Sequence, residues 1–105
     1  MHIQINTDKN ISGHEALAQS VEEILNRVLA RFAGQITRLE VHLSDENSAS
    51  KSGVIDKRCL LEARLAGREP ISVSDLAPTI EQAVSSAAHK MVSLLESELG
   101  KLGKH

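Results

Sequence analysis

Five side chains able to bind a metal or attack a substrate lie near one polar stretch of the sequence. They are His42, Asp45, Glu46, Asp56 and Cys59. Imidazole, carboxylate and thiolate groups are the usual zinc ligands of proteins. The apolar and polar residues alternate in a way that points His42 and Cys59 to opposite faces of a sheet. We therefore expect these side chains not to converge, and no metal site.

Cys59 is the only cysteine, so neither an internal disulfide nor a zinc site with several thiolates can form. Lys57 and Arg58 precede it, and cations beside a thiol can activate it as a nucleophile. The inward parity of Cys59 favours the alternative, a buried and inert thiol. No glycine-rich phosphate loop, nucleophile elbow or catalytic carboxylate pair occurs. We expect neither an enzyme nor a cofactor.

The composition describes a globular chain that is poor in aromatic residues. The 105 residues are 41% hydrophobic and 25% charged, which is typical of one folded domain. Phe32 is the only aromatic residue, which argues against RNA binding by base stacking. The formal charge is −2, so affinity for a polyanion requires a local basic patch. No leader peptide or membrane-spanning apolar run is present, and we expect a soluble cytoplasmic protein without a membrane partner.

Hydropathy alternates with a period of two in four stretches and a period of three to four in two others. Strands are predicted over 2–6, 37–44, 58–65 and 71–74, and helices over 12–34 and 75–100. Ser12 and Glu15 fit a capping box at the first helix, and Gly34 fits its end. Asp75 is the expected cap of the second helix, with Pro78 in its first turn.

The apolar stripes of the predicted helices are regular. The first is formed by Leu17, Val21, Ile24, Leu25, Val28 and Phe32. The second is formed by Leu76, Ile80, Val84, Ala87, Met91, Leu94, Leu95 and Leu102. On the second strand, Thr37, Leu39, Val41 and Leu43 share one face. Two amphipathic helices and strands with one apolar face predict an α+β fold, a two-layer sandwich of order β-α-β-β-β-α. Its four-stranded mixed sheet carries both helices on one face, the last three strands form an antiparallel meander, and the first strand runs parallel to a neighbour.

Positive charge is concentrated in the middle of the chain. Residues 27–68 hold eight basic and five acidic residues, a net charge of +3. The outward face of the second and third strands carries Arg38, His42, Arg58 and Arg64, with Glu40 and Glu62 between them. One interpretation is a solvated face whose opposite charges pair across strands. The other is a surface that follows RNA phosphates, completed by Arg27 and Arg31 at the end of the first helix.

Several short motifs resemble the ribosome hibernation-promoting factor family, which includes ribosome-associated inhibitor A. Asn10-Ile11, Leu17, Val21-Glu22-Glu23 and Leu25 are similar to its first helix. Arg31-Phe32, Ile36-Thr37, Val41 and Leu43-Ser44 resemble the helix end and second strand, and Asp75-Leu76 with Ile80 resembles the entry to the last helix. The resemblance implies one hibernation-factor-like domain over 1–105, of the short form, with a loop at about 45–56 and a flexible tail at about 100–105.

The resemblance also implies a non-catalytic protein that binds the small ribosomal subunit, through its ribosomal RNA, and silences translation under stress or in stationary phase. No DNA partner is expected. The resemblance suggests Arg31 and Lys90 as RNA contacts. The charge pattern alone adds Arg27, Arg38, Lys51, Lys57, Arg58, Arg64 and Arg68.

The chain departs from the family at its last helix. Ala77 replaces a tyrosine, Ser86 and His89 stand where basic residues are expected, and residues 75–99 sum to −3. These departures favour a divergent branch and leave a second hypothesis open. In that hypothesis the fold is a protein-binding or self-associating stress module without ribosome binding. Leu60 would then lie in a homodimer interface on the outer sheet face; the expected state is a monomer, with a homodimer through this face as the alternative.

Overall fold

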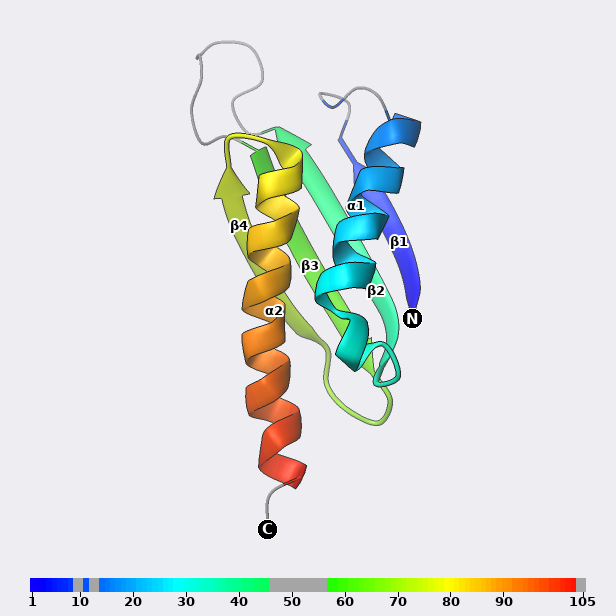
Figure 1. The fold of residues 1–105 in the computed structure, drawn as a ribbon, viewed down its shortest axis with the longest axis vertical. Coiled ribbons are helices and arrows are strands. Elements are labelled where there is room, and N and C mark those ends of the chain that lie inside the picture. The colour runs from blue at the N-terminus through cyan, green and yellow to red at the C-terminus, as the bar shows by residue number, and fades with distance from the viewer. Residues whose placement is uncertain (9–10, 12–13, 46–56, 104–105) are drawn as a thin grey trace.

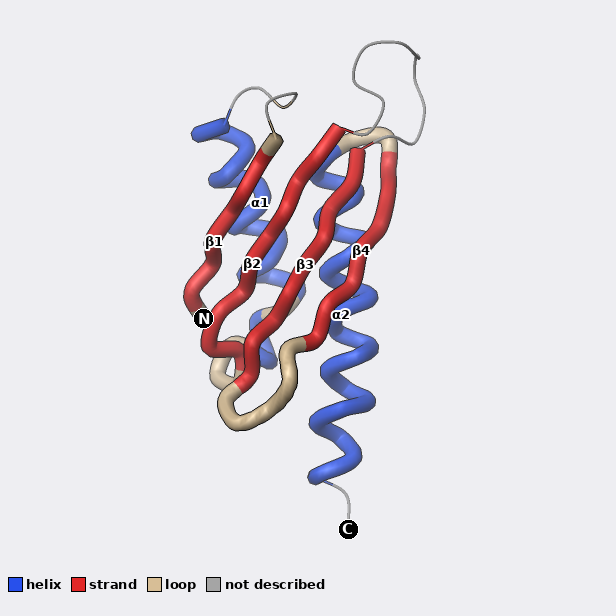
Figure 2. Tube along the Cα trace, turned by 180° about the vertical axis from the view of Figure 1, so that it is seen from behind, coloured by secondary structure: helices blue, strands red, loops and turns tan. Residues whose placement is uncertain are grey.

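Two helices cover one face of a four-stranded sheet, and the other face is open. The computed structural model describes residues 1–8, 11, 14–45 and 57–103, without the side chains of residue 14 and residues 100–103. The elements are β1 (His2–Thr7), α1 (His14–Val28), a 3₁₀ helix η1 (Ala30–Phe32), β2 (Ile36–Asp45), β3 (Lys57–Leu65), β4 (Ile71–Ala77) and α2 (Ile80–Gly103). Figure 1 shows α1 and α2 in front of the sheet, and Figure 2 shows the uncovered strands from behind. The predicted α+β class, element order and two-layer arrangement are confirmed.

The strands lie in the order β1-β2-β3-β4. β1 runs parallel to β2, with Ile3 beside Leu39. β2, β3 and β4 form the predicted antiparallel meander, in which Val41 lies opposite Leu61 and Leu61 opposite Val73. Gly67 in the β3–β4 turn has φ 70°, a left-handed conformation that glycine adopts without steric cost.

The inner face of the sheet forms the core with the helices. Leu39, Val41, Cys59, Leu61 and Ala63 are fully buried there. At the start of β2 the predicted parity is wrong. A register shift between Ile36 and Arg38 places Ile36 in the core and leaves Thr37 exposed, where its hydroxyl donates to the Arg64 carbonyl at 3.0 Å. Such a β-bulge inserts an extra residue and so changes the face that the preceding side chain occupies.

The first helix is shorter than its apolar stripe suggests. α1 ends at Val28, and the chain tightens into η1, where the Phe32 amide donates to the Leu29 carbonyl at 2.9 Å. Phe32 still packs into the core because a 3₁₀ turn continues the helical path. Gly34 therefore does not end α1, and its φ is not positive. The predicted cap Ser12 lies outside the described residues.

The second helix begins later than predicted because β4 is longer. Asp75 lies within β4, and Leu76 is 45% exposed on that strand rather than part of a helical stripe. The N-cap is Thr79, whose Oγ1 accepts from the Gln82 amide at 3.1 Å and donates to Gln82 Oε1 at 3.3 Å. The Thr79 hydroxyl thus caps the Gln82 amide as in a capping box, but the Gln82 side chain meets that hydroxyl rather than the Thr79 backbone amide.

α2 extends beyond the end of the sheet and reaches Gly103 rather than residue 100 (Figures 1 and 2). Its predicted stripe is confirmed at Val84, Ala87, Met91 and Leu95, which are fully buried, but Leu94 is 39% exposed. In the part of the chain that the structure describes, no helix is long and apolar enough to cross a membrane.

Candidate nucleic-acid interface

Like charges face each other across the outer side of the sheet. Arg38 of β2 lies opposite Arg64 of β3, and Glu40 lies opposite Glu62. Among the described residues of this face, no Arg–Glu ion pair joins β2 to β3, so the interpretation that its opposite charges pair across these strands fails. Arg38 instead pairs along its own strand, where its Nε donates to Glu40 Oε2 at 3.0 Å, and it also donates to the Gln4 side chain on β1.

Glu40 is shared between two basic side chains. Its second oxygen, Oε1, lies 3.7 Å from His42 Nε2, so this carboxylate bridges His42 and Arg38. Arg38 thus contributes little free positive charge to the outer face. The prediction that His42 points outward is confirmed by its half-exposed side chain on the open side of β2.

Arg58 and Arg64 are the two arginines of the outer face that no carboxylate neutralises within the described residues. Both lie on β3, six residues apart, which corresponds to about 20 Å along a strand. Arg64 is exposed, and Arg58 is half-buried opposite Ser44 and Leu76. Their guanidinium groups can donate hydrogen bonds to a phosphate without first losing an ion pair.

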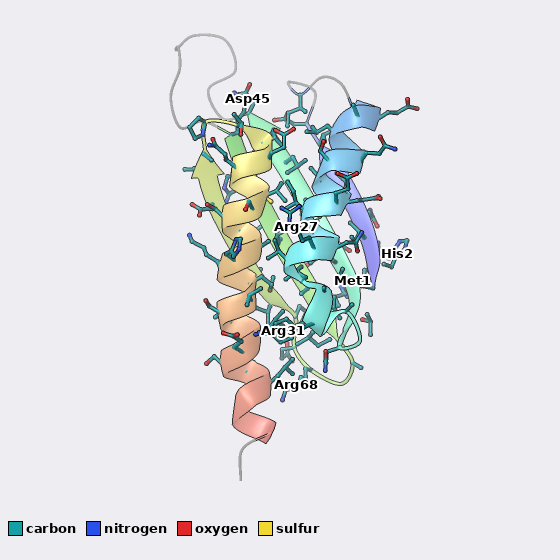
Figure 3. All side chains as sticks on the ribbon, viewed as in Figure 1. Met1, His2, Arg27, Arg31, Asp45 and Arg68 are labelled. Carbon is teal, nitrogen blue, oxygen red and sulfur yellow. The ribbon has the colours of Figure 1, made fainter. Side chains whose placement is uncertain are left out.

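Three more arginines lie on the side of the molecule that carries the helices (Figure 3). Arg27 is exposed in the last turn of α1 and has no ion pair among the described residues. Arg31 of η1 pairs with Glu96 of α2, and its guanidinium carbon lies 4.9 Å from the centre of the Phe32 ring.

Arg68 of the β3–β4 turn has Nη1 at 3.9 Å from Glu98 Oε1. Arg31 and Arg68 therefore both form ion pairs with glutamates in the C-terminal half of α2.

Two of the predicted lysine contacts are engaged in the fold, and the third, Lys51, lies outside the described residues. Lys57 Nζ lies 3.5 Å from Asp45 Oδ2. Lys90 Nζ donates to the Ser74 carbonyl at 3.1 Å and lies 3.6 Å from Asp75 Oδ2. Because β4 is an edge strand, Lys90 satisfies a carbonyl that would otherwise be open to another strand.

His42 and Cys59, the candidate metal ligand and the candidate nucleophile, lie on opposite faces of the sheet, as the alternation of the strands predicted. Cys59 is fully buried on the inner face and His42 lies on the outer face. Burial raises the pKa of the Cys59 thiol from 9.0 to about 12, which makes it unreactive at neutral pH. Within the described residues no three His, Cys, Asp or Glu side chains are grouped for metal binding. Glu46 and Asp56 lie outside this part of the chain.

The sequence analysis missed three residues that shape the surface. Glu96 and Glu98 hold arginines from other elements, and such tertiary pairing leaves no signal in the local sequence. Thr79 could have been found in the sequence, because it stands three residues before Gln82, the sequence pattern of a capping box. The sequence analysis chose Asp75 as the cap instead, because it places a proline in the first helical turn.

An open sheet face, an outer layer of arginines and two covering helices define a two-layer α+β domain with a charged surface. Residues 3–103 match the family described as sigma 54 modulation protein / S30EA ribosomal protein. The chain therefore belongs to this family of ribosome-associated proteins.

Solved structures share the fold at low sequence identity. The N-terminal domain of protein Y from Thermus thermophilus is 21% identical with a TM-score of 0.70, and the match covers 92% of this chain and 98% of that one. A ribosomal subunit interface protein from Coxiella burnetii is 20% identical with a TM-score of 0.73, covering 95% and 99%. No curated protein matches the chain by sequence.

Proposed function

We propose that the protein is a non-catalytic factor of the cytoplasm that binds the small ribosomal subunit through its RNA and inhibits translation under stress or in stationary phase. Membership of a ribosome-associated family supports ribosome binding. The observation that carries the RNA contact is the pair Arg58 and Arg64, which stand on an open sheet face without a neutralising carboxylate among the described residues.

Phosphate contacts rather than base stacking would provide the affinity. Phe32, the only Phe, Tyr or Trp of the chain, is buried beneath Arg31, so no phenyl, phenol or indole ring is available for a base. Free arginines lie on both sides of the domain, Arg58 and Arg64 on the sheet and Arg27 on α1. A domain placed in an RNA-lined channel would use both sides, and it would inhibit by occupying space that messenger and transfer RNAs require.

The direct test is co-sedimentation of the protein with purified small ribosomal subunits at about 50 mM and about 200 mM salt. Each phosphate contact should contribute about 0.7–0.9 log units of affinity per log unit of salt. We expect migration with the subunit at low salt and release at high salt. Inhibition is then tested by adding the protein to a cell-free translation reaction. Failure to migrate with the subunit at low salt would refute the proposal.

Self-association through the outer face is the second candidate, and one feature of that face favours it. Leu60 lies opposite Ser74, two residues from the exposed Leu76, so the two leucines are diagonal neighbours on the open side of β3 and β4. A homodimer would cover them. Light scattering coupled to gel filtration decides between the candidates: the proposal predicts a mass near 11.4 kDa, and twice that mass would favour the dimer.

A further inference from the structure

The C-terminal half of α2 holds two arginines that come from different elements. Glu96 pairs with Arg31 of η1, and Glu98 lies 3.9 Å from Arg68 of the β3–β4 turn. Figure 3 shows both arginines beside this part of α2. Two carboxylates of α2 therefore form ion pairs with Arg31 and Arg68, two of the three described arginines on this side of the molecule.

Arg31 is positioned before any ligand arrives. Its guanidinium lies over the Phe32 ring, and Phe32 is buried in the core. A guanidinium held by a cation–π contact loses less conformational freedom when it binds an anion. Its side chain is still 63% exposed, so an external phosphate can reach it.

The carboxylates are held weakly enough to be exchanged. The Glu96 and Glu98 side chains are 53% and 46% exposed, and ion pairs in such positions contribute little to stability because water and salt screen them. Phosphate presents the same acceptor geometry to a guanidinium with more oxygens and more charge. RNA can therefore replace the carboxylates, at the cost of leaving two negative charges beside its backbone.

We propose that Glu96 and Glu98 are determinants of RNA affinity that compete with phosphate for Arg31 and Arg68. This inference rests on the proposed function for its biological partner. The two glutamates lower the affinity for RNA below the value that the arginines alone would give, and this effect weakens as salt screens the charges.

The test compares the double variant Glu96→Gln/Glu98→Gln with Glu22→Gln/Glu81→Gln, which removes the same charge from two exposed glutamates that have no ion pair among the described residues. Dissociation constants are measured with purified small ribosomal subunits at about 100 mM salt. We expect Glu96→Gln/Glu98→Gln to bind about three- to tenfold more tightly than wild type, and the control variant to gain less than about twofold. Equal gains in the two variants would show a general charge effect and overturn the inference.

A second measurement keeps the inference testable without ribosomes. Elution from a heparin column reports affinity for a sulfated polyanion, and the Glu96→Gln/Glu98→Gln variant should elute at higher salt than both the wild type and the control. If wild type fails to bind the subunit, the proposed function fails, while the heparin result still decides the competition. If wild type binds the subunit and both assays show no specific gain, only the competition is refuted. Thermal unfolding of each variant confirms that the fold is retained.

Discussion

The two faces of the sheet differ in what their side chains meet. On the inner face Cys59, Leu61 and Ala63 of β3 are fully buried beneath the helices. On the outer face the intervening Arg58, Leu60 and Arg64 of the same strand meet solvent or a strand neighbour. One strand thus supplies the core and the candidate interface from alternate residues, and substitutions in it can separate stability from binding.

The comparison also shows that counting charges does not locate a binding surface. The outer face holds Arg38 and Arg64 opposite each other, yet Glu40 pairs with Arg38 and not with Arg64. On the helix side Arg31 and Arg68 carry the same formal charge but are paired with α2. An arginine without an ion pair gains a new contact when it binds phosphate, whereas a paired arginine must first give up its carboxylate.

The largest predicted effect is a difference in stability between alanine variants of two adjacent leucines of β3, one on each face of the sheet. Leu61→Ala removes a fully buried side chain from the inner face and should lower the free energy of unfolding by about 2–5 kcal/mol. Leu60→Ala, on the outer face, should cost less than about 1.5 kcal/mol because its side chain is only half-buried. Urea denaturation measures both. Equal losses would mean that the outer face is covered in solution, as in the dimer.

The next prediction concerns pH and the inner face. Burial raises the pKa of Cys59 from 9.0 to about 12, so above about pH 9 the unfolded chain loses a proton that the folded chain keeps. The free energy of unfolding should therefore fall by about 1.4 kcal/mol per pH unit between about pH 9 and pH 12 through this thiol. Cys59→Ala removes this contribution. The stability advantage of wild type over the variant should shrink as pH rises, and a constant difference would contradict the buried thiol.

A smaller effect is expected at the start of the helix that covers β3 and β4. Thr79→Ala removes the hydroxyl that accepts from the Gln82 amide and should cost about 0.5–2 kcal/mol of unfolding free energy. Ser86→Ala in the exposed middle of α2 is the control, with an expected change within about 0.5 kcal/mol. If Thr79→Ala behaves like the control, Thr79 is not the cap.

The sequence predicts the fold well because the inner-face pattern is local and repeated. Alternation across Leu39, Val41, Cys59 and Leu61 determines which face is buried, and a shift of one residue would reverse every side chain. The failures lie at element boundaries. The bulge that exposes Thr37 and the extension of β4 through Asp75 arise from tertiary pairing rather than local preference.

The candidate site is less predictable than the fold. The sequence identifies the arginines and their faces, but the pairing of Arg31 and Arg68 depends on the path of α2, which brings distant glutamates beside them. Lys90 illustrates the same limit. It is one base on an exposed helix face in the sequence, and in the structure it binds the edge of β4.

The central claim is that phosphate contacts from the free arginines of the outer face bind the small ribosomal subunit. The most direct measurement is the salt dependence of that affinity for wild type, Arg58→Gln/Arg64→Gln and the charge-retaining control Arg58→Lys/Arg64→Lys. We predict that the glutamine variant binds at least about tenfold more weakly and that its slope falls by about 1.4–1.8 log units per log unit of salt, while the lysine variant keeps the wild-type slope. An unchanged affinity and slope in the glutamine variant would contradict the claim and exclude the outer sheet face as the RNA surface.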